Sequence, residues 1–134
     1  MTYVEEPNDP GNELGRIMMI AFDILSGLLA LILAAAGIAK LAGVAQMRVG
    51  AERFGIPWPR YRLIGVAELA AVLGIGAGLA WRPFGLAAVV GSGILMIGAL
   101  GYHRRAGDPP AEAAGAGVTL ALCLGYLITA LVAL

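Results

Sequence analysis

The chain has 134 residues, of which 60% are hydrophobic and only 13% are charged, and its mean hydropathy is +0.85. This composition excludes an ordinary soluble domain, in which charged residues are about twice as frequent. Nine basic side chains balance nine acidic ones, so nothing indicates binding to nucleic acid. The single cysteine, Cys123, excludes an internal disulfide and a CxxC redox pair.

Residues 1–16 are expected to form a polar acidic tail. The stretch "MTYVEEPNDPGNELGR" holds four acids and one arginine, whereas a secretory signal needs a basic start and a small-residue cleavage site. We therefore interpret it as part of the mature protein. Asp9 followed by Pro10 predicts a cap for a short helix that leads into the first apolar segment.

Four apolar segments follow, at residues 17–39, 63–81, 84–101 and 115–134. Each has about the length of a bilayer crossing, which takes roughly 20 residues of α-helix. We expect an all-α protein in which residues 17–134 form a single integral membrane four-helix bundle, with short connections and one longer interfacial loop.

The longer loop, "KLAGVAQMRVGAERFGIPWPRYR", joins the first and second spans. Its start can extend the first helix, while Pro57 and Pro59 favour a non-helical segment after it. Phe54, Trp58 and Tyr61 among arginines are typical of the headgroup level of a membrane. This pattern predicts an interfacial loop rather than a solvated one.

The basic residues are distributed unequally between the two sides of the predicted bundle. Two of them, Arg16 and Arg82, fall on the side of the termini. Seven fall on the other side: Lys40, Arg48, Arg53, Arg60, Arg62, Arg104 and Arg105. Because lysine and arginine concentrate in cytoplasmic loops, we expect the long loop to be cytoplasmic and both termini to be external.

Small residues recur at every fourth position in two of the spans. The fourth span has Ala113, Gly117, Ala121, Gly125, Thr129 and Ala133, and the second has Ala70, Gly74 and Gly78. Helices in lipid associate by close packing at small residues. We expect these residues to lie at helix contacts, within the chain or with a second copy, so a homo-oligomer remains an open possibility.

Glu68 is an acid near the start of an apolar span, where a charge costs less than the roughly 2.5 to 3.5 kcal/mol of a helix centre. Alternating topology brings Lys40, at the end of the first span, and His103, at the end of the third, to the same end of the bundle. An acid beside a cation stays ionised in a low dielectric, and lysine can also release a proton when it is buried.

We name Glu68, His103 and Lys40 as candidate catalytic residues, with Tyr102 and Arg62 as candidate ligand contacts and no metal site. Structural roles remain open: a packing carboxylate, a C-terminal helix cap at His103 and a boundary lysine.

Two further residues are interpreted as structural. Asp23 lies in the second turn of the first span, and Arg82 lies in the tip between the second and third spans. Both fall on the same side of the membrane, so they are expected to form an ion pair. Cys123 is expected to be a small packing residue.

Four stretches in order resemble the DoxX-like family of small four-span membrane proteins: "GIAKLAG", "RFGIPWPR", "RLIGVAELAAVLGIGAGL" and "GALGYHRRAGD", which cover most of residues 37–108. The resemblance implies a four-helix membrane fold. For some members it also implies association with quinone-linked or sulfur-compound oxidoreductases.

These observations favour a subunit of, or partner to, a membrane redox assembly, with a polar cleft at one end of the bundle for a quinone or other lipophilic ligand. With one histidine and one cysteine the chain has no redox ligand set of its own, so we expect a protein partner and no covalently bound cofactor. The alternatives are a stand-alone enzyme doing acid–base chemistry on a lipophilic substrate, a small transporter and a scaffold. The expected location is the inner (plasma) membrane of a bacterium, as a multi-pass protein in contact with lipid.

Overall fold

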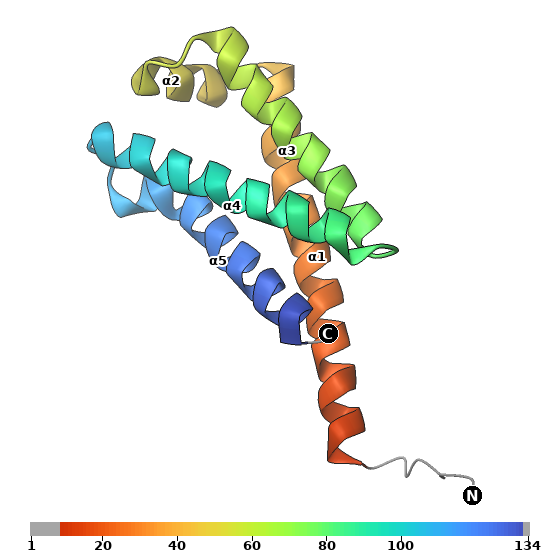
Figure 1. Ribbon diagram of the computed structural model, residues 1–134. Coiled ribbons are helices and arrows are strands. Elements are labelled where there is room, and N and C mark those ends of the chain that lie inside the picture. Colours follow the sequence, from red (N-terminus) through yellow and green to blue (C-terminus); the bar gives the residue numbers. More distant parts are fainter. Residues whose placement is uncertain (1–8, 133–134) are drawn as a thin grey trace, which may run out of the picture.

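The computed structural model describes residues 9–132, and five helices cover nearly all of them (Figure 1). They are α1 (Pro10–Ala42), α2 (Ala45–Phe54), α3 (Trp58–Gly78), α4 (Arg82–Arg105) and α5 (Pro110–Val132). Residues 9–132 contain no strand. Four helices, α1, α3, α4 and α5, are long and apolar enough to cross a membrane. The all-α four-helix bundle expected from the sequence is therefore confirmed.

The four long helices form a closed ring, because α1 and α4 each contact both α3 and α5. The 33-residue α1 is about 50 Å long at 1.5 Å per residue, and its N-terminal part extends beyond the other helices (Figure 1). The short helix α2 lies across the end where α1 and α4 finish and α3 and α5 begin, and it contacts α1, α3 and α4. We refer to this end as the α2 end.

The helices are longer than the predicted spans. The N-terminal cap at Asp9 is confirmed, since its carboxylate accepts a hydrogen bond from the backbone N–H of Gly11 at 3.3 Å. Helix α1 therefore takes in residues 10–16 of the expected tail, while residues 1–8 lie outside the described part of the chain. Helices α3 and α5 likewise begin five residues before their predicted starts, at Trp58 and Pro110.

Most of the long connection between the first and second spans is helical. Helix α2 is bounded by Gly43 and Gly55, whose φ angles of 71° and 67° are readily adopted only by glycine. Pro57 and Pro59 do not hold the chain out of a helix. Pro57 is the N-cap of α3 and Pro59 lies in its first turn, where the N–H donor that proline lacks would have no helical partner in any case.

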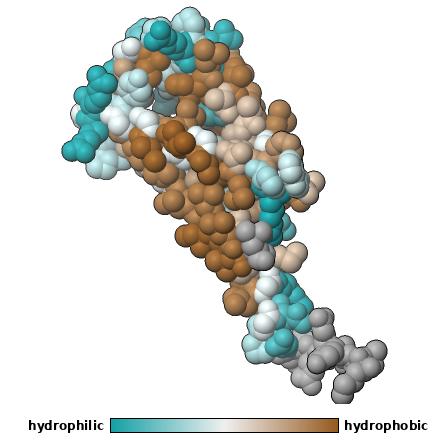
Figure 2. All heavy atoms as spheres, viewed as in Figure 1, coloured by the Kyte–Doolittle hydropathy of each residue, from teal (hydrophilic) through white to brown (hydrophobic). Residues whose placement is uncertain are grey.

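The outer surface has the character of a membrane-embedded protein. Hydrophobic side chains cover the middle of the molecule, and hydrophilic ones gather at the α2 end and toward the N-terminus of α1 (Figure 2). Large apolar side chains point outward from the long helices, among them Leu31 at 68% and Leu73 at 76% exposure. Apolar side chains exposed in this number need lipid around them, so the chain is a small integral membrane protein.

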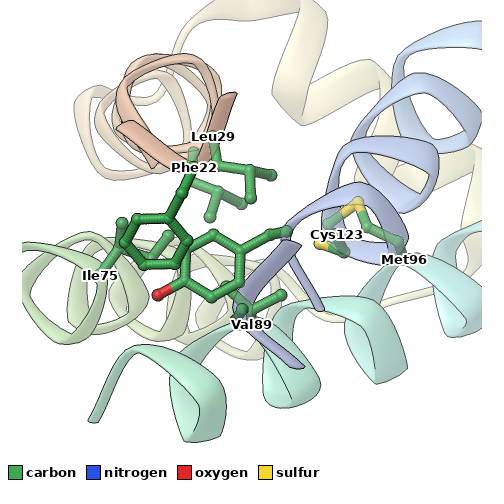
Figure 3. Packing of buried hydrophobic residues seen from close by; sticks show 9 residues of the cluster. Phe22, Leu29, Ile75, Val89, Met96 and Cys123 are labelled. Atoms are coloured by element: carbon green, nitrogen blue, oxygen red, sulfur yellow. The ribbon is translucent and has the colours of Figure 1, made fainter. Parts of the chain in front are cut away.

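The hydrophobic core lies between the four long helices, away from α2. Figure 3 shows Phe22 and Leu29 of α1 facing Ile75 of α3 and Val89 of α4. The ring of Tyr126 from α5 lies 4.8 Å from that of Phe22. Cys123 is 1% exposed in this cluster, in the packing position expected for it.

Close helix contacts occur at glycines of α3 and α4, and the row of small residues predicted on α5 lies at helix contacts only in part. A Cβ placed on Gly78 of α3 would lie 2.5 Å from the Cα of Gly85 in α4, and one on Gly74 would lie 2.6 Å from the Cβ of Ala88. On α5, a Cβ on Gly117 would meet nothing within 4 Å and Ala121 is exposed. Ala133 lies outside the described residues. Further along the same row, a Cβ on Gly125 would lie 3.5 Å from the side chain of Leu25 in α1, and Thr129 is buried. Positions spaced by four rotate steadily around a helix of 3.6 residues per turn, so only part of the row faces the other helices.

The predicted Asp23–Arg82 ion pair is not formed. Asp23 is exposed on α1, and no ion pair within residues 9–132 includes it. The guanidinium of Arg82 instead donates a hydrogen bond to the backbone carbonyl of Ala130 at 3.1 Å and lies over the ring of Phe22, 5.5 Å from its centroid.

Candidate functional site: a cavity beneath α2

A cavity of about 650 Å³ lies at the α2 end of the bundle, and all five helices contribute to its wall. Leu33 and Met96 belong both to the core cluster and to the cavity wall, so the core forms its floor. Helix α2 covers the cavity with a run of residues from Gln46 to Phe54. Most of the lining is apolar, and the polar side chains of the wall include Lys40, Glu68 and His103.

Lys40 and Glu68 form a buried ion pair in this wall. The ammonium nitrogen of Lys40 lies 3.1 Å from Oε1 and 3.0 Å from Oε2 of Glu68. The two side chains are only 10% and 3% exposed. Taking two charges out of water is costly unless each finds a partner in good geometry, and here each does. The contact expected from the sequence is therefore present.

The pair is positioned by a close crossing of α1 and α3 one turn away. Gly37 and Gly65, each three residues before a member of the pair, lie against one another. A Cβ on Gly65 would be 2.9 Å from the Cβ of Lys40 and 3.0 Å from the carbonyl oxygen of Gly37. Since side chains three apart lie on one helix face, the glycine contact brings the ammonium and the carboxylate together.

His103 lines the same cavity but has a different partner. Its Nδ1 lies 2.6 Å from Oδ2 of Asp108, an oxygen that also accepts a hydrogen bond from the guanidinium of Arg53 in α2 at 3.0 Å. No hydrogen bond or ion pair joins His103 to Glu68 in residues 9–132. The three expected residues therefore line one cavity but belong to two separate pairs, Lys40 with Glu68 and His103 with Asp108.

The two candidate ligand contacts lie in different places. Tyr102 lines the cavity, and its ring packs 5.8 Å from that of Phe54. Arg62 is exposed, is not among the lining residues, and donates a hydrogen bond to the backbone carbonyl of Leu41 at 3.3 Å. The structure therefore does not bring Arg62 together with the other four residues.

Three residues of this site, Tyr61, Arg53 and Asp108, were not assigned to it from the sequence. Tyr61 stands beside the ion pair, with its ring centroid 5.6 Å from the Lys40 ammonium. Asp108 is 5% exposed and links α2 to the end of α4 through Arg53 and His103. The signal for Asp108 was its position five residues after the only histidine, in the stretch "GYHRRAGD". Residues 9–132 contain no cluster of three or more side chains suited to hold a metal ion.

A comparison with protein-family models matches residues 24–126 to the DoxX-like family. No curated protein and no solved structure matches the chain. The matched range takes in α2, α3 and α4 in full and most of α1 and α5, and it includes every residue of the two ion pairs described above. The chain belongs to the DoxX-like family of membrane proteins.

Proposed function

We propose that this protein is a small subunit of, or partner to, a membrane redox assembly, and that its cavity holds a quinone or another lipophilic molecule with a polar head. The observation that carries the proposal is the cavity beneath α2, which joins a mostly apolar wall to a buried Lys40–Glu68 pair. Its volume of about 650 Å³ lies within the range of roughly 300 to 1,000 Å³ typical of small-molecule sites.

Access from the lipid supports a lipophilic ligand. Val49 of α2 and Ile94 of α4 line the cavity and are also 60% and 66% exposed, so the cavity reaches the apolar outer surface. A ligand dissolved in the bilayer can then enter without crossing water. Because the chain has one histidine and one cysteine, the electrons of a redox reaction would have to come from a partner protein or from the ligand.

A quenching experiment tests the ligand cavity. Trp58 stacks on Tyr61 at a centroid distance of 5.9 Å, and Tyr61 lines the cavity. With Trp81 replaced by Phe, Trp58 is the only tryptophan, and a short-chain quinone should quench its fluorescence in a saturable way. Ala99→Phe, which places a ring in the cavity wall, should abolish the saturable part. Ala87→Phe, exposed on the same helix, should not, and equal quenching in both variants would contradict the proposal.

Purification in mild detergent tests the redox partner. The protein should come with a larger membrane protein, and the absorbance spectrum of the complex should contain haem or flavin bands. Mass spectrometry of the same sample identifies the polypeptides and any lipophilic small molecule. A chain that purifies alone under conditions that preserve other membrane complexes would contradict the redox proposal.

The His103–Asp108 contact favours a second candidate, a stand-alone enzyme with acid–base chemistry. A histidine whose Nδ1 is held by a carboxylate has its tautomer and orientation set for proton transfer at Nε2. His103 lines the cavity, and Asp108 holds its Nδ1 at 2.6 Å. A chain that purifies without a protein partner but with a bound lipid would favour this function over the first.

A further inference from the structure

We infer that the charge pairs in the wall make the cavity selective for ligands with an uncharged, oxygen-bearing head and exclude ionic amphiphiles of similar size. This inference rests on the proposed function, since it concerns the ligand of the same cavity. It adds the chemical class of the head, which neither the family nor the cavity volume specifies.

The first step is the balance of charge inside the cavity. The deeply buried charges of the wall, Lys40 and Glu68, pair with each other, and Arg53 and His103 both contact the Asp108 carboxylate. Glu112, whose side chain is 50% exposed, lies 4.0 Å from Arg53. Within residues 9–132 no buried side-chain nitrogen or oxygen lacks a hydrogen-bond partner. The wall therefore has no deeply buried charge without a partner to offer an ionic ligand.

The second step is what an ionic ligand would have to do. An anion would be repelled by the Glu68 carboxylate unless it displaced that carboxylate from the Lys40 ammonium, and a cation would be repelled by the ammonium unless it displaced it from the carboxylate. Either exchange leaves one member of the pair buried and without its counter-ion, which is the costly state for charges in a low dielectric. A charged head would also lose its own hydration on entering the cavity.

The third step is what the wall offers to an uncharged head. An ammonium has three N–H donors, and within residues 9–132 those of Lys40 have only the two oxygens of Glu68 as hydrogen-bond partners. The hydroxyl of Tyr61 donates to the sulfur of Met47 at 3.9 Å, and thioether sulfur is a weak acceptor. A carbonyl or hydroxyl oxygen can use both donors without separating the pair.

The test uses three brominated probes of equal chain length. The bromoalkanol has a neutral head, the bromoalkyl sulfonate a permanently anionic one and the bromoalkyl trimethylammonium a permanently cationic one. Bromine quenches Trp58 in the Trp81→Phe background, so binding is read without a quinone. In the wild-type cavity the alcohol should bind at least about tenfold more tightly than the sulfonate, a difference easily resolved in a titration. Glu68→Gln should then raise the sulfonate affinity by about tenfold or more, because Lys40 lacks its counter-ion.

Asp23→Asn is the matched control, since it also removes one negative charge from the same bundle but at an exposed position of α1. It should leave the preference for the alcohol unchanged. If Glu68→Gln does not fold, Lys40→Met with the cationic probe makes the mirror-image measurement. The comparison of the three probes in the Trp81→Phe background needs no substitution in the cavity.

The outcomes separate the two proposals. A wild-type cavity that binds the sulfonate as tightly as the alcohol overturns the charge selectivity but leaves the ligand cavity standing. An unchanged sulfonate affinity in Glu68→Gln also overturns it. If neither the probes nor the quinone quench Trp58 in a saturable way, the ligand cavity of the proposed function fails, and the selectivity with it.

Discussion

Gly65→Ala should destabilise the protein although it adds only one methyl group. The new Cβ would lie 2.9 Å from the Cβ of Lys40 and 3.0 Å from the carbonyl oxygen of Gly37. Neither atom belongs to the flexible end of a side chain, so α1 and α3 must move apart. Overpacking of this kind costs about 1 to 3 kcal/mol. Against it stands the gain from replacing a helical glycine by alanine, up to about 1 kcal/mol.

Gly76→Ala on the same helix isolates that gain, because a Cβ there would meet nothing within 4 Å. We therefore expect Gly65→Ala to be less stable than Gly76→Ala by about 1 to 3 kcal/mol, measured by unfolding in mixed micelles and followed by circular dichroism. Quinone quenching of Trp58 should weaken only in Gly65→Ala, since that substitution displaces the Lys40 backbone. Equal stability of the two variants would refute the close crossing of α1 and α3.

Three further predictions concern the α2 end. Lys40→Met should destabilise the protein by about 3 to 5 kcal/mol in detergent, because it leaves a buried carboxylate without its cation. Glu68→Gln should cost less stability because it removes the more deeply buried charge. A larger loss of stability in Glu68→Gln than in Lys40→Met would contradict the pairing. Asp108→Asn should speed backbone hydrogen exchange in α2, since the Asp108 carboxylate contacts both Arg53 of α2 and His103 of α4. Unchanged exchange would mean that these contacts do not hold α2 in place. A reporter fused to the C-terminus should read as external, and a cytoplasmic signal would overturn the orientation derived from the basic residues.

Hydropathy and charge placement were enough to predict the four membrane helices and the Lys40–Glu68 contact. Apolar runs of about 20 residues have few alternatives to a membrane helix. Once the helices alternate in direction, the end of the first and the start of the second must lie at one level. A lone acid at that level needs a cation, and Lys40 is the nearest one on the neighbouring helix.

Helix α2 could not be predicted in the same way. Its sequence "AQMRVGAERF" mixes apolar and basic residues, and this composition is equally typical of an interfacial loop. The prolines after it suggested a break, whereas in the structure they mark the start of α3. The Asp23–Arg82 prediction failed for a related reason. Topology places both residues on one side of the membrane, but only the rotation of each helix decides which way a side chain points, and Asp23 points outward.

The positions of the close glycine contacts explain why Glu68 meets Lys40 and not His103. Helices α1 and α3 approach most closely at Gly37 and Gly65, one turn from the ion pair, so the two helices are still adjacent where the charged side chains lie. Helices α3 and α4 approach at Gly78 and Gly85 and again at Gly74 and Ala88, and Gly74 is six residues from Glu68, roughly 9 Å along the helix axis. Over that distance α4 diverges from α3, and the space that opens between them is the cavity that α2 covers. Glycine placement thus determines both which charges pair and where a ligand fits.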